Sequence, residues 1–206
     1  MSDSDTAVLC PDQVRPWAAA RRIVMTVGVL AFAMSFTGLA AARGRGCAGA
    51  HTPIARTSRA SLQRAVVCLV NVERHMHGLP GLTESSRLNR SAQGWTNVMV
   101  AHRYFSHGAN FAARISAVGF DWSNVGENIA TGYRTPTAVV RAWMASTSHC
   151  QNVLNPLFRY VGTGVSDHAI AGYSTRTGTW TQDFGLRMGQ HPASGNWGPA
   201  QGCPYN

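Results

Sequence analysis

The segment GENIATGY, residues 126–133, brings a carboxylate, Glu127, between a glycine and an asparagine. Gly126 permits close approach of the main chain, and the Asn128 side chain can bond neighbouring main-chain groups. The segment therefore predicts a tight, internally bonded turn that carries Glu127 inward and continues into the core.

Two histidines lie about twenty residues to either side of Glu127, namely His107 and His149. A carboxylate that meets two imidazoles can ligate a metal, take part in general acid/base chemistry, or form a buried hydrogen-bond network. None of the three uses is excluded by the residue types alone.

Apolar residues recur at three- and four-residue spacing along much of the chain, which is typical of amphipathic helices. Helices are predicted over residues 62–76, 86–101, 112–118 and 136–145, with a short helical piece in 146–156. Three strand candidates follow, separated by turn residues: YVGTGVS (160–166), HAIAGYS (168–174) and TWTQDFG (179–185). Helices followed by an antiparallel meander predict an α+β layered domain.

Composition supports one globular domain, because 45% of the 206 residues are hydrophobic and 13% are charged. The net charge of +9 comes entirely from 18 arginines, since the chain contains no lysine. These arginines form no run and are not interleaved with aromatic residues, so nucleic-acid binding is not expected.

Residues 1–42 have the features of a targeting segment. Arginines precede the apolar run 23–34, and an A-x-A-like cleavage site occupies residues 40–42, which predicts export by a signal peptide. With residues 35–42 included, the uncharged run is 20 residues long. At ~30 Å it is also long enough to remain as an uncleaved N-terminal membrane anchor.

The rest of the chain divides by composition. Residues 43–60 lack periodicity and are interpreted as a linker, residues 61–187 as the domain, and residues 188–206 as an irregular tail. Four cysteines lie beyond the apolar run, an even number that is compatible with two disulfides in an oxidising compartment: Cys47, Cys68, Cys150 and Cys203. Three pairings are open, and free thiols at Cys47 and Cys68 are the alternative.

An ordered set of short motifs resembles the CAP superfamily, also called SCP-like, in the form found in secreted bacterial proteins. The resemblance covers roughly residues 62–187 and rests on NVER with GLPGL (71–82), FSH (105–107), GENIATGY, WMAS with HCQNVLNP (143–156), VGTGV (161–165) and WTQDFG (180–185). It implies an α-β-α sandwich with a small antiparallel sheet, a cleft on one side, and a secreted or cell-envelope location. It also implies that Cys68 pairs with Cys150, because the family packs the first helix near the segment of the second histidine.

The cleft of this family usually holds two histidines and two acidic residues. The matching positions are His107, Glu127 and His149, whereas Ser146 stands where the second glutamate is expected. The three remaining residues are predicted to converge, as ligands of zinc or another divalent ion or as a structural network. In a converged group the carboxylate would raise the histidine pKa values unless burial or a metal opposes it.

The functional expectation is an exported, monomeric, non-catalytic binding module whose envelope or extracellular ligand is a lipid, peptide or glycan. A hydrolase is the alternative, with His107, Glu127 and His149 catalytic in a metal-dependent version and Ser146 or Ser148 beside His149 in a serine-dependent one. No G-x-S-x-G elbow accompanies these serines. A lipid-binding protein is the second alternative, with a groove lined by Phe105, Phe111, Phe120, Trp122 and Tyr133.

Overall fold

A computed structural model of the protein describes residues 46–192 and 202–203. The chain divides into Met1–Ala41 and Ala42–Asn206, and every described element belongs to the second unit. The predicted signal peptide or anchor, residues 1–42, lies outside the described residues. Among the helices that are described, none is long and apolar enough to cross a membrane.

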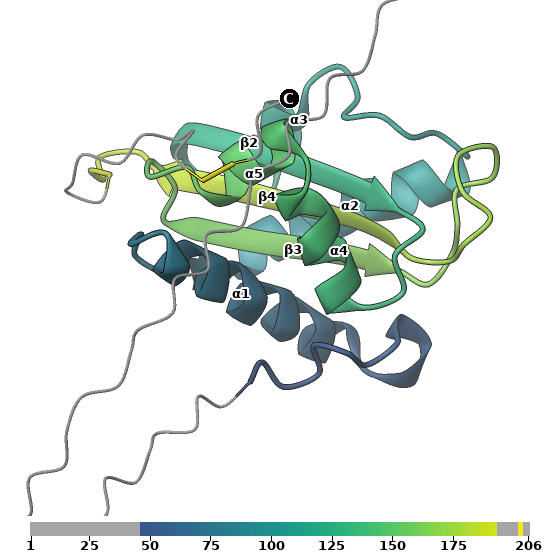
Figure 1. Ribbon diagram of the computed structural model, residues 1–206. Coiled ribbons are helices and arrows are strands. Elements are labelled where there is room, and N and C mark those ends of the chain that lie inside the picture. Colours follow the sequence, from purple (N-terminus) through teal and green to yellow (C-terminus); the bar gives the residue numbers. More distant parts are fainter. Residues whose placement is uncertain (1–45, 193–201, 204–206) are drawn as a thin grey trace, which may run out of the picture. The chain divides into compact units, whose positions relative to one another are not determined.

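Three helices cover one face of a central sheet (Figure 1): α1 (Arg59–Met76), α4 (Pro136–Met144) and α5 (Thr147–Val153). Two of them begin at side-chain caps. Ser58 accepts a hydrogen bond from the Ser61 N–H at the start of α1, and Thr135 caps α4, whose first residue is Pro136 as the sequence predicts.

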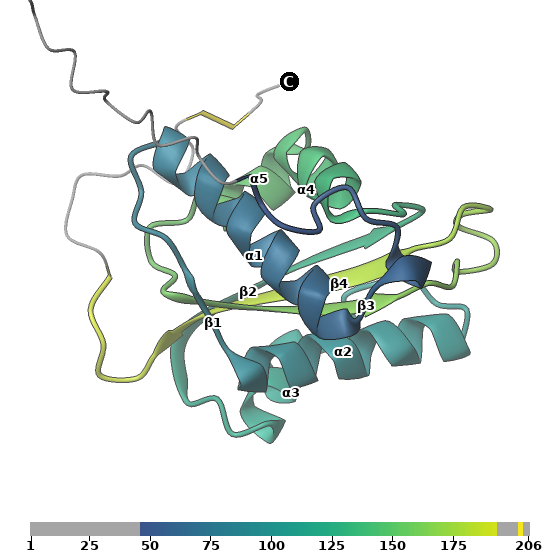
Figure 2. The same cartoon turned by 90° about the horizontal axis from the view of Figure 1, so that it is seen from below.

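The opposite face carries α2 (Ser86–Ala101) and α3 (Phe111–Ala117), as Figure 2 shows. The helix α2 lies very close to the sheet because two glycines of VGTGV face it. A Cβ on Gly162 would clash with the main chain of Leu88 and Asn89, and one on Gly164 with that of Ala92. The VGTGV motif therefore sets how closely α2 packs.

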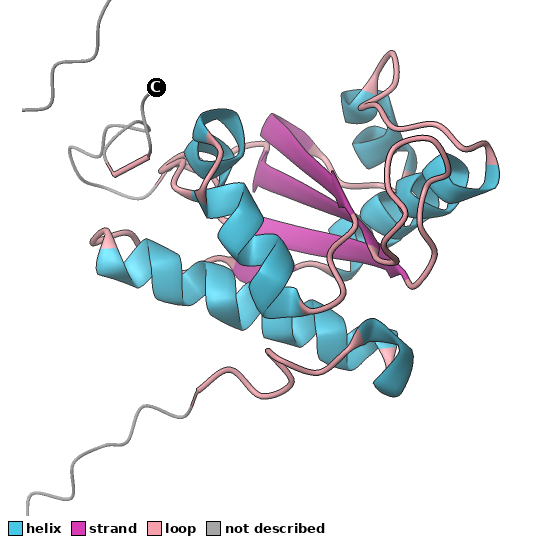
Figure 3. Ribbon diagram, turned by 45° about the vertical axis from the view of Figure 1, so that its right-hand side comes forward, coloured by secondary structure: helices cyan, strands magenta, loops and turns pink. Residues whose placement is uncertain are grey.

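The sheet has four strands in the order β1-β3-β4-β2: β1 (Thr83–Glu84), β2 (Trp122–Thr131), β3 (Tyr160–Ser166) and β4 (Thr179–Arg187). β1 pairs with β3 in parallel, and the other two pairings are antiparallel. The α+β class and the α-β-α layers are confirmed (Figure 3).

Most of the outer edge of β3 has no strand beside it, because β1 pairs only with Tyr160 and Val161. Side-chain amides from α1 and α2 replace the missing strand. Gln93 donates to the Val165 carbonyl at 3.1 Å and accepts from its N–H at 3.0 Å. Thr163 is bonded in the same way, by Gln63 at its carbonyl and by Asn89 at its N–H. The edge of β3 is thus sealed by the chain itself.

Two predictions of local structure are wrong. Residues 126–131 of GENIATGY form the second half of β2, and the turn begins only at Gly132, whose φ is 91°. Pairing with β4 overrides the local turn preference of Gly126 and Asn128. Residues 168–174 form turns instead of a strand. Their apolar pattern reflects one anchor, Ile170, which is fully buried against Met99 and Ile129.

The expected linker 43–60 is folded onto the domain from Gly46 onward, and α1 begins two residues before the predicted domain boundary. Ala50 and Ile54 are buried. The Ile54 N–H bonds to the Arg134 carbonyl, and both the N–H and the hydroxyl of Thr137 bond to the Ala50 carbonyl. Two buried apolar residues and these hydrogen bonds hold the segment in place. The sequence of the segment has no periodic pattern from which they could be predicted.

The expected pair of disulfides is confirmed, but the pairing of Cys68 with Cys150 is wrong. Cys47 bonds Cys68, and Cys150 bonds Cys203. Each bridge ties a peripheral segment to a helix, the N-terminal segment to α1 and the tail to α5. A bridge between the two helices would have left both ends of the domain without a covalent tie.

Candidate functional site

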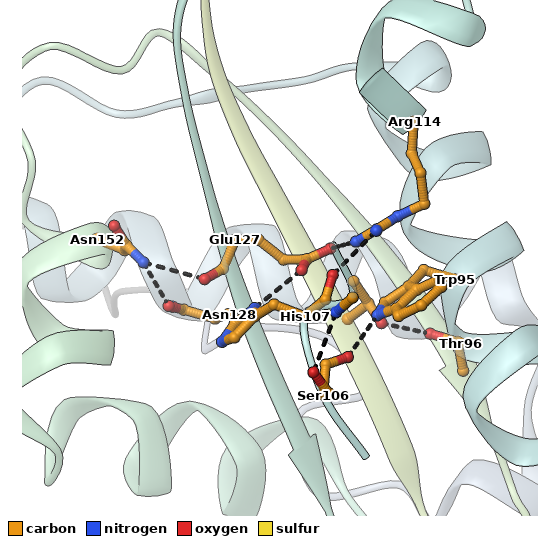
Figure 4. Close-up of polar contacts among 10 residues, drawn as sticks. Trp95, Thr96, Ser106, His107, Arg114, Glu127, Asn128 and Asn152 are labelled. Atoms are coloured by element: carbon orange, nitrogen blue, oxygen red, sulfur yellow. Dashed lines mark hydrogen bonds and ion pairs between the residues drawn. The ribbon is translucent and has the colours of Figure 1, made fainter. Parts of the chain in front are cut away.

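Glu127 is the centre of the candidate site, and its side chain is only 1% exposed. His107 approaches one carboxylate oxygen with Nδ1 at 2.9 Å, and Arg114 approaches the other with a guanidinium nitrogen at 2.6 Å (Figure 4). Both oxygens therefore have a partner. Paired and charge-assisted hydrogen bonds of this kind are what a buried carboxylate requires.

The loop between α2 and α3 places His107, and Arg114 of α3 holds that loop. Besides its bond to Glu127, Arg114 donates to the His107 carbonyl at 3.0 Å, and its guanidinium lies 3.8 Å from the centre of the Trp95 ring. The Trp95 indole N–H donates to the Ser106 carbonyl. Loop, helix and strand are thus joined around one carboxylate.

On the other side of β2, the side chains of Asn128 and Asn152 tie the strand to α5. Asn152 donates to the Glu127 carbonyl at 3.1 Å and to the Asn128 side-chain oxygen at 2.9 Å. Asn128, which is fully buried, donates to the His149 carbonyl. These amides position the segment that bears the second histidine.

His149 does not bond Glu127; its Nδ1 lies 3.0 Å from the hydroxyl of Ser146, which begins α5. Burial, and then the charge of His107, lower the pKa of His149. Burial therefore opposes the predicted rise of the His149 pKa. His107 and Glu127 therefore meet directly, while His149 contacts Ser146 instead.

A metal site does not fit this arrangement. Within residues 46–192 and 202–203, no three His, Cys, Asp or Glu side chains are grouped so that they could hold an ion. Both oxygens of Glu127 and the Nδ1 of His107 already have partners. An ion bound by Glu127 would have to share its oxygens with His107 and Arg114.

Sequence reasoning missed Arg114 and Asp183. Asp183 of β4 lies opposite Glu127 in a pair without mutual main-chain bonds, the arrangement in which facing side chains come closest. It is 1% exposed, and its carboxyl group lies beside Ser91 and Glu127 without a hydrogen bond of good geometry within the described chain. Burial first, and then the charge of Glu127, raise the pKa of Asp183 well above its usual range. The available signal was an acidic residue inside a segment that the sequence itself predicts to be a strand, TWTQDFG.

The aromatic residues proposed to line a lipid groove are spread over three separate hydrophobic clusters, with Tyr133 in the first, Phe105 in the third and the others in the second. A pocket of about 400 Å³ is lined by Phe120 and Trp122 together with Ser116, Gly119 and Asp121. One continuous groove is not formed by these five side chains.

Comparison with known proteins places this geometry in a family. The model of the cysteine-rich secretory protein family, CAP, matches residues 67–184. An uncharacterized protein of Bacillus subtilis, YkwD, is 36% identical over 138 residues, which are 65% of this chain and 50% of the relative. An uncharacterized membrane protein of the same organism, YlbC, is 31% identical over 107 residues, 50% of this chain and 31% of the relative.

The fold is also shared with a solved structure. An extracellular protein containing an SCP domain from Bacillus anthracis superimposes with a TM-score of 0.55 and 25% identity, over 64% of this chain and 44% of the other. This chain spans half or less of the length of the curated relatives that it matches. Its motifs, its layers and the family match agree, and the chain belongs to the CAP, or cysteine-rich secretory protein, family.

Proposed function

We propose that this chain is an exported CAP domain that acts as a non-catalytic binding module in the cell envelope or extracellular space. Two disulfides are typical of proteins from oxidising compartments. The similar Bacillus anthracis protein is described as extracellular. The predicted targeting segment, residues 1–42, is consistent with the same location.

One observation carries the non-catalytic part of the proposal, namely the state of Glu127. A general acid or base must come within hydrogen-bonding reach of its substrate. The Glu127 side chain is 1% exposed and both of its oxygens are held, by His107 and Arg114. A carboxylate in this position joins the helix layer to the sheet and does not face a ligand.

Turnover by the purified domain tests this proposal. Arrayed peptide and ester substrates are expected to remain intact with the wild-type protein. Hydrolysis that survives purification and disappears in His149→Ala would overturn the non-catalytic assignment. Mass spectrometry of material copurified from the native host would then identify the bound class of molecule directly.

Serine-dependent hydrolysis is kept as a second candidate because of one contact, that of the Ser146 hydroxyl with Nδ1 of His149, whose pKa is lowered by burial. A neutral imidazole is the form that can accept a hydroxyl proton. Glu127, the third group that such a triad needs to orient the imidazole, is bonded instead to His107 and Arg114. Loss of a measured esterase activity in Ser146→Ala, with the fold retained, would support this candidate.

A further inference from the structure

β2 is the last strand of the sheet, so one of its edges has no strand beside it. The Gly132 N–H bonds to the Gly178 carbonyl, and the β2–β4 register continues this pairing along the even-numbered residues of β2. In an antiparallel pair the intervening residues direct their N–H and C=O groups away from the partner. The outward residues are Val125, Glu127, Ile129 and Thr131.

One of these outward groups is bonded: the Glu127 carbonyl accepts from Asn152. Within the part of the chain that the structure describes, the remaining outward N–H and C=O groups of Val125, Glu127, Ile129 and Thr131 have no hydrogen-bond partner. Glu127 as a whole residue is 5% exposed although its side chain is 1% exposed. The small exposed area of Glu127 therefore belongs mainly to its main chain.

Most of the devices that normally protect such an edge are missing from β2. Its sequence, WSNVGENIAT, contains no proline and no lysine; the inward-pointing Glu127 and the register shift between Trp122 and Asn124 are the two protective features that it does have. The same domain seals the edge of β3 with three amide side chains. An unsealed edge at β2 is thus a local property of this strand and not of the fold.

Two histidine side chains that could contact a bound ligand lie on either side of this edge. His107 lies toward the α2 layer with 48% of its side chain exposed, and its Nδ1 is held by Glu127. His149 lies toward the α5 side and is partly exposed. Because side chains of a strand alternate between the two faces, those of an added strand would point toward each imidazole in turn.

We propose that the outer edge of β2 binds the extended main chain of a partner polypeptide as an additional strand of the sheet. This inference rests on the proposed binding function and names its partner class. Main-chain hydrogen bonds to Val125, Glu127 and Ile129 supply the affinity, and the two histidines supply side-chain selectivity.

The test uses the full domain and an arrayed library of random ten-residue peptides, read by fluorescence anisotropy after resynthesis of the best binder. N-methylation of the binder at alternate residues, those facing β2, is expected to weaken binding about tenfold or more for each lost bond, and N-methylation at the other residues to leave it within about twofold. Val125→Pro removes one outward N–H and is expected to abolish binding, whereas Val125→Ala keeps the N–H and the affinity.

Three results with peptides would each overturn the proposal: an array without binders, binding that is indifferent to the position of N-methylation, or equal affinity of Val125→Pro and Val125→Ala. A concentration-dependent dimer in sedimentation that Val125→Pro disrupts would assign the edge to a second copy of the chain, which also overturns it. Hydrolysis of a bound peptide would contradict only the non-catalytic function. A copurified lipid or glycan, together with no peptide binding, would contradict the proposed strand binding at β2 and leave the proposed binding function intact.

Discussion

The two edges of the sheet in this CAP domain are built from similar strands and finished in opposite ways. Along β3, Gln63, Asn89 and Gln93 supply the donors and acceptors that a further strand would supply. Along β2, Asn152 supplies one donor to one carbonyl. A buried main-chain group left unpaired is costly, which is the reason that the edge of β3 carries these amides. The outer main-chain groups of Thr163 and Val165 in β3 are therefore paired within the domain. Those of β2 mostly lack a partner among the described residues, and they are the groups proposed above to bind an added strand.

The candidate site lies beside the outer edge of β2. Glu127 belongs to β2, His107 approaches it from the α2 side, and the amides of Asn128 and Asn152 connect it to α5. Hydrogen bonds among the side chains of Glu127, His107, Asn128 and Asn152 hold this edge in one shape. Most of its outward main-chain groups have no hydrogen-bond partner within the described chain. Rigidity of this kind is useful to a binding strand, because less conformational entropy is lost on association.

Proline substitution on each edge should give the largest contrast. Val165→Pro removes an N–H that Gln93 accepts and leaves a buried side-chain oxygen unpaired, so we expect a loss of about 3 kcal/mol in the free energy of unfolding beyond that of Val165→Ala. Val125→Pro removes an unbonded N–H, and we expect a loss of less than about 1 kcal/mol beyond Val125→Ala. Urea denaturation of the four variants measures both differences. Equal losses on the two edges would contradict the comparison.

Removing a side-chain amide from each edge should show the same difference between β3 and β2, with smaller losses in the free energy of unfolding. Gln93→Ala leaves two buried main-chain groups of Val165 unpaired, and we expect a loss of about 2 to 3 kcal/mol. Asn152→Ala frees a carbonyl at the open edge, where water can replace the amide, and should cost about 1 kcal/mol. A loss for Asn152→Ala as large as that for Gln93→Ala would show that β2 is sealed as tightly as β3.

The charge of Glu127 is expected to stabilise the fold through His107 and Arg114, although the same charge raises the pKa of Asp183. Glu127→Gln weakens the bonds to His107 and Arg114, and we expect a loss of about 2 kcal/mol in thermal or urea unfolding. Glu84→Gln on β1 changes an exposed carboxylate that accepts from Asn89, and serves as the matched control with a change within about 0.5 kcal/mol. Unchanged stability in Glu127→Gln would remove the structural role assigned to the carboxylate.

Asp183→Asn tests the second buried carboxyl through its pH dependence. In the unfolded chain Asp183 has an ordinary pKa of 3.8. In the folded protein its pKa is raised, so the side chain stays protonated to higher pH. The folded state then holds more protons in this window, and stability falls as pH rises through it. The amide of the Asp183→Asn variant cannot ionise, so the variant should lose this fall and be the more stable protein at neutral pH. A wild-type stability that rises with pH over the same window, and a variant that does not, would contradict the assignment.

The layers of the fold follow from the sequence because α1, α2 and α4 carry periodic apolar faces and side-chain caps. His107 and Glu127 were also predictable, as the family motifs that bear them were recognised in order. Five features were not: the strand through Gly126 and Asn128, the turns of residues 168–174, the fold of residues 46–58, the disulfide partners, and Arg114. Each depends on contacts between distant segments, for which local patterns carry no signal.

Amide hydrogen exchange resolved by NMR on the ligand-free domain tests the unequal edges most directly. The N–H groups of Thr163 and Val165 are expected to exchange slowly, since Asn89 and Gln93 accept them. Along β2 the rates should alternate, with slow exchange at the even positions 126, 128 and 130, which face β4, and faster exchange at 125, 127 and 129. Uniform protection along β2, equal to that of β3, would mean that its edge is already covered and would contradict the account.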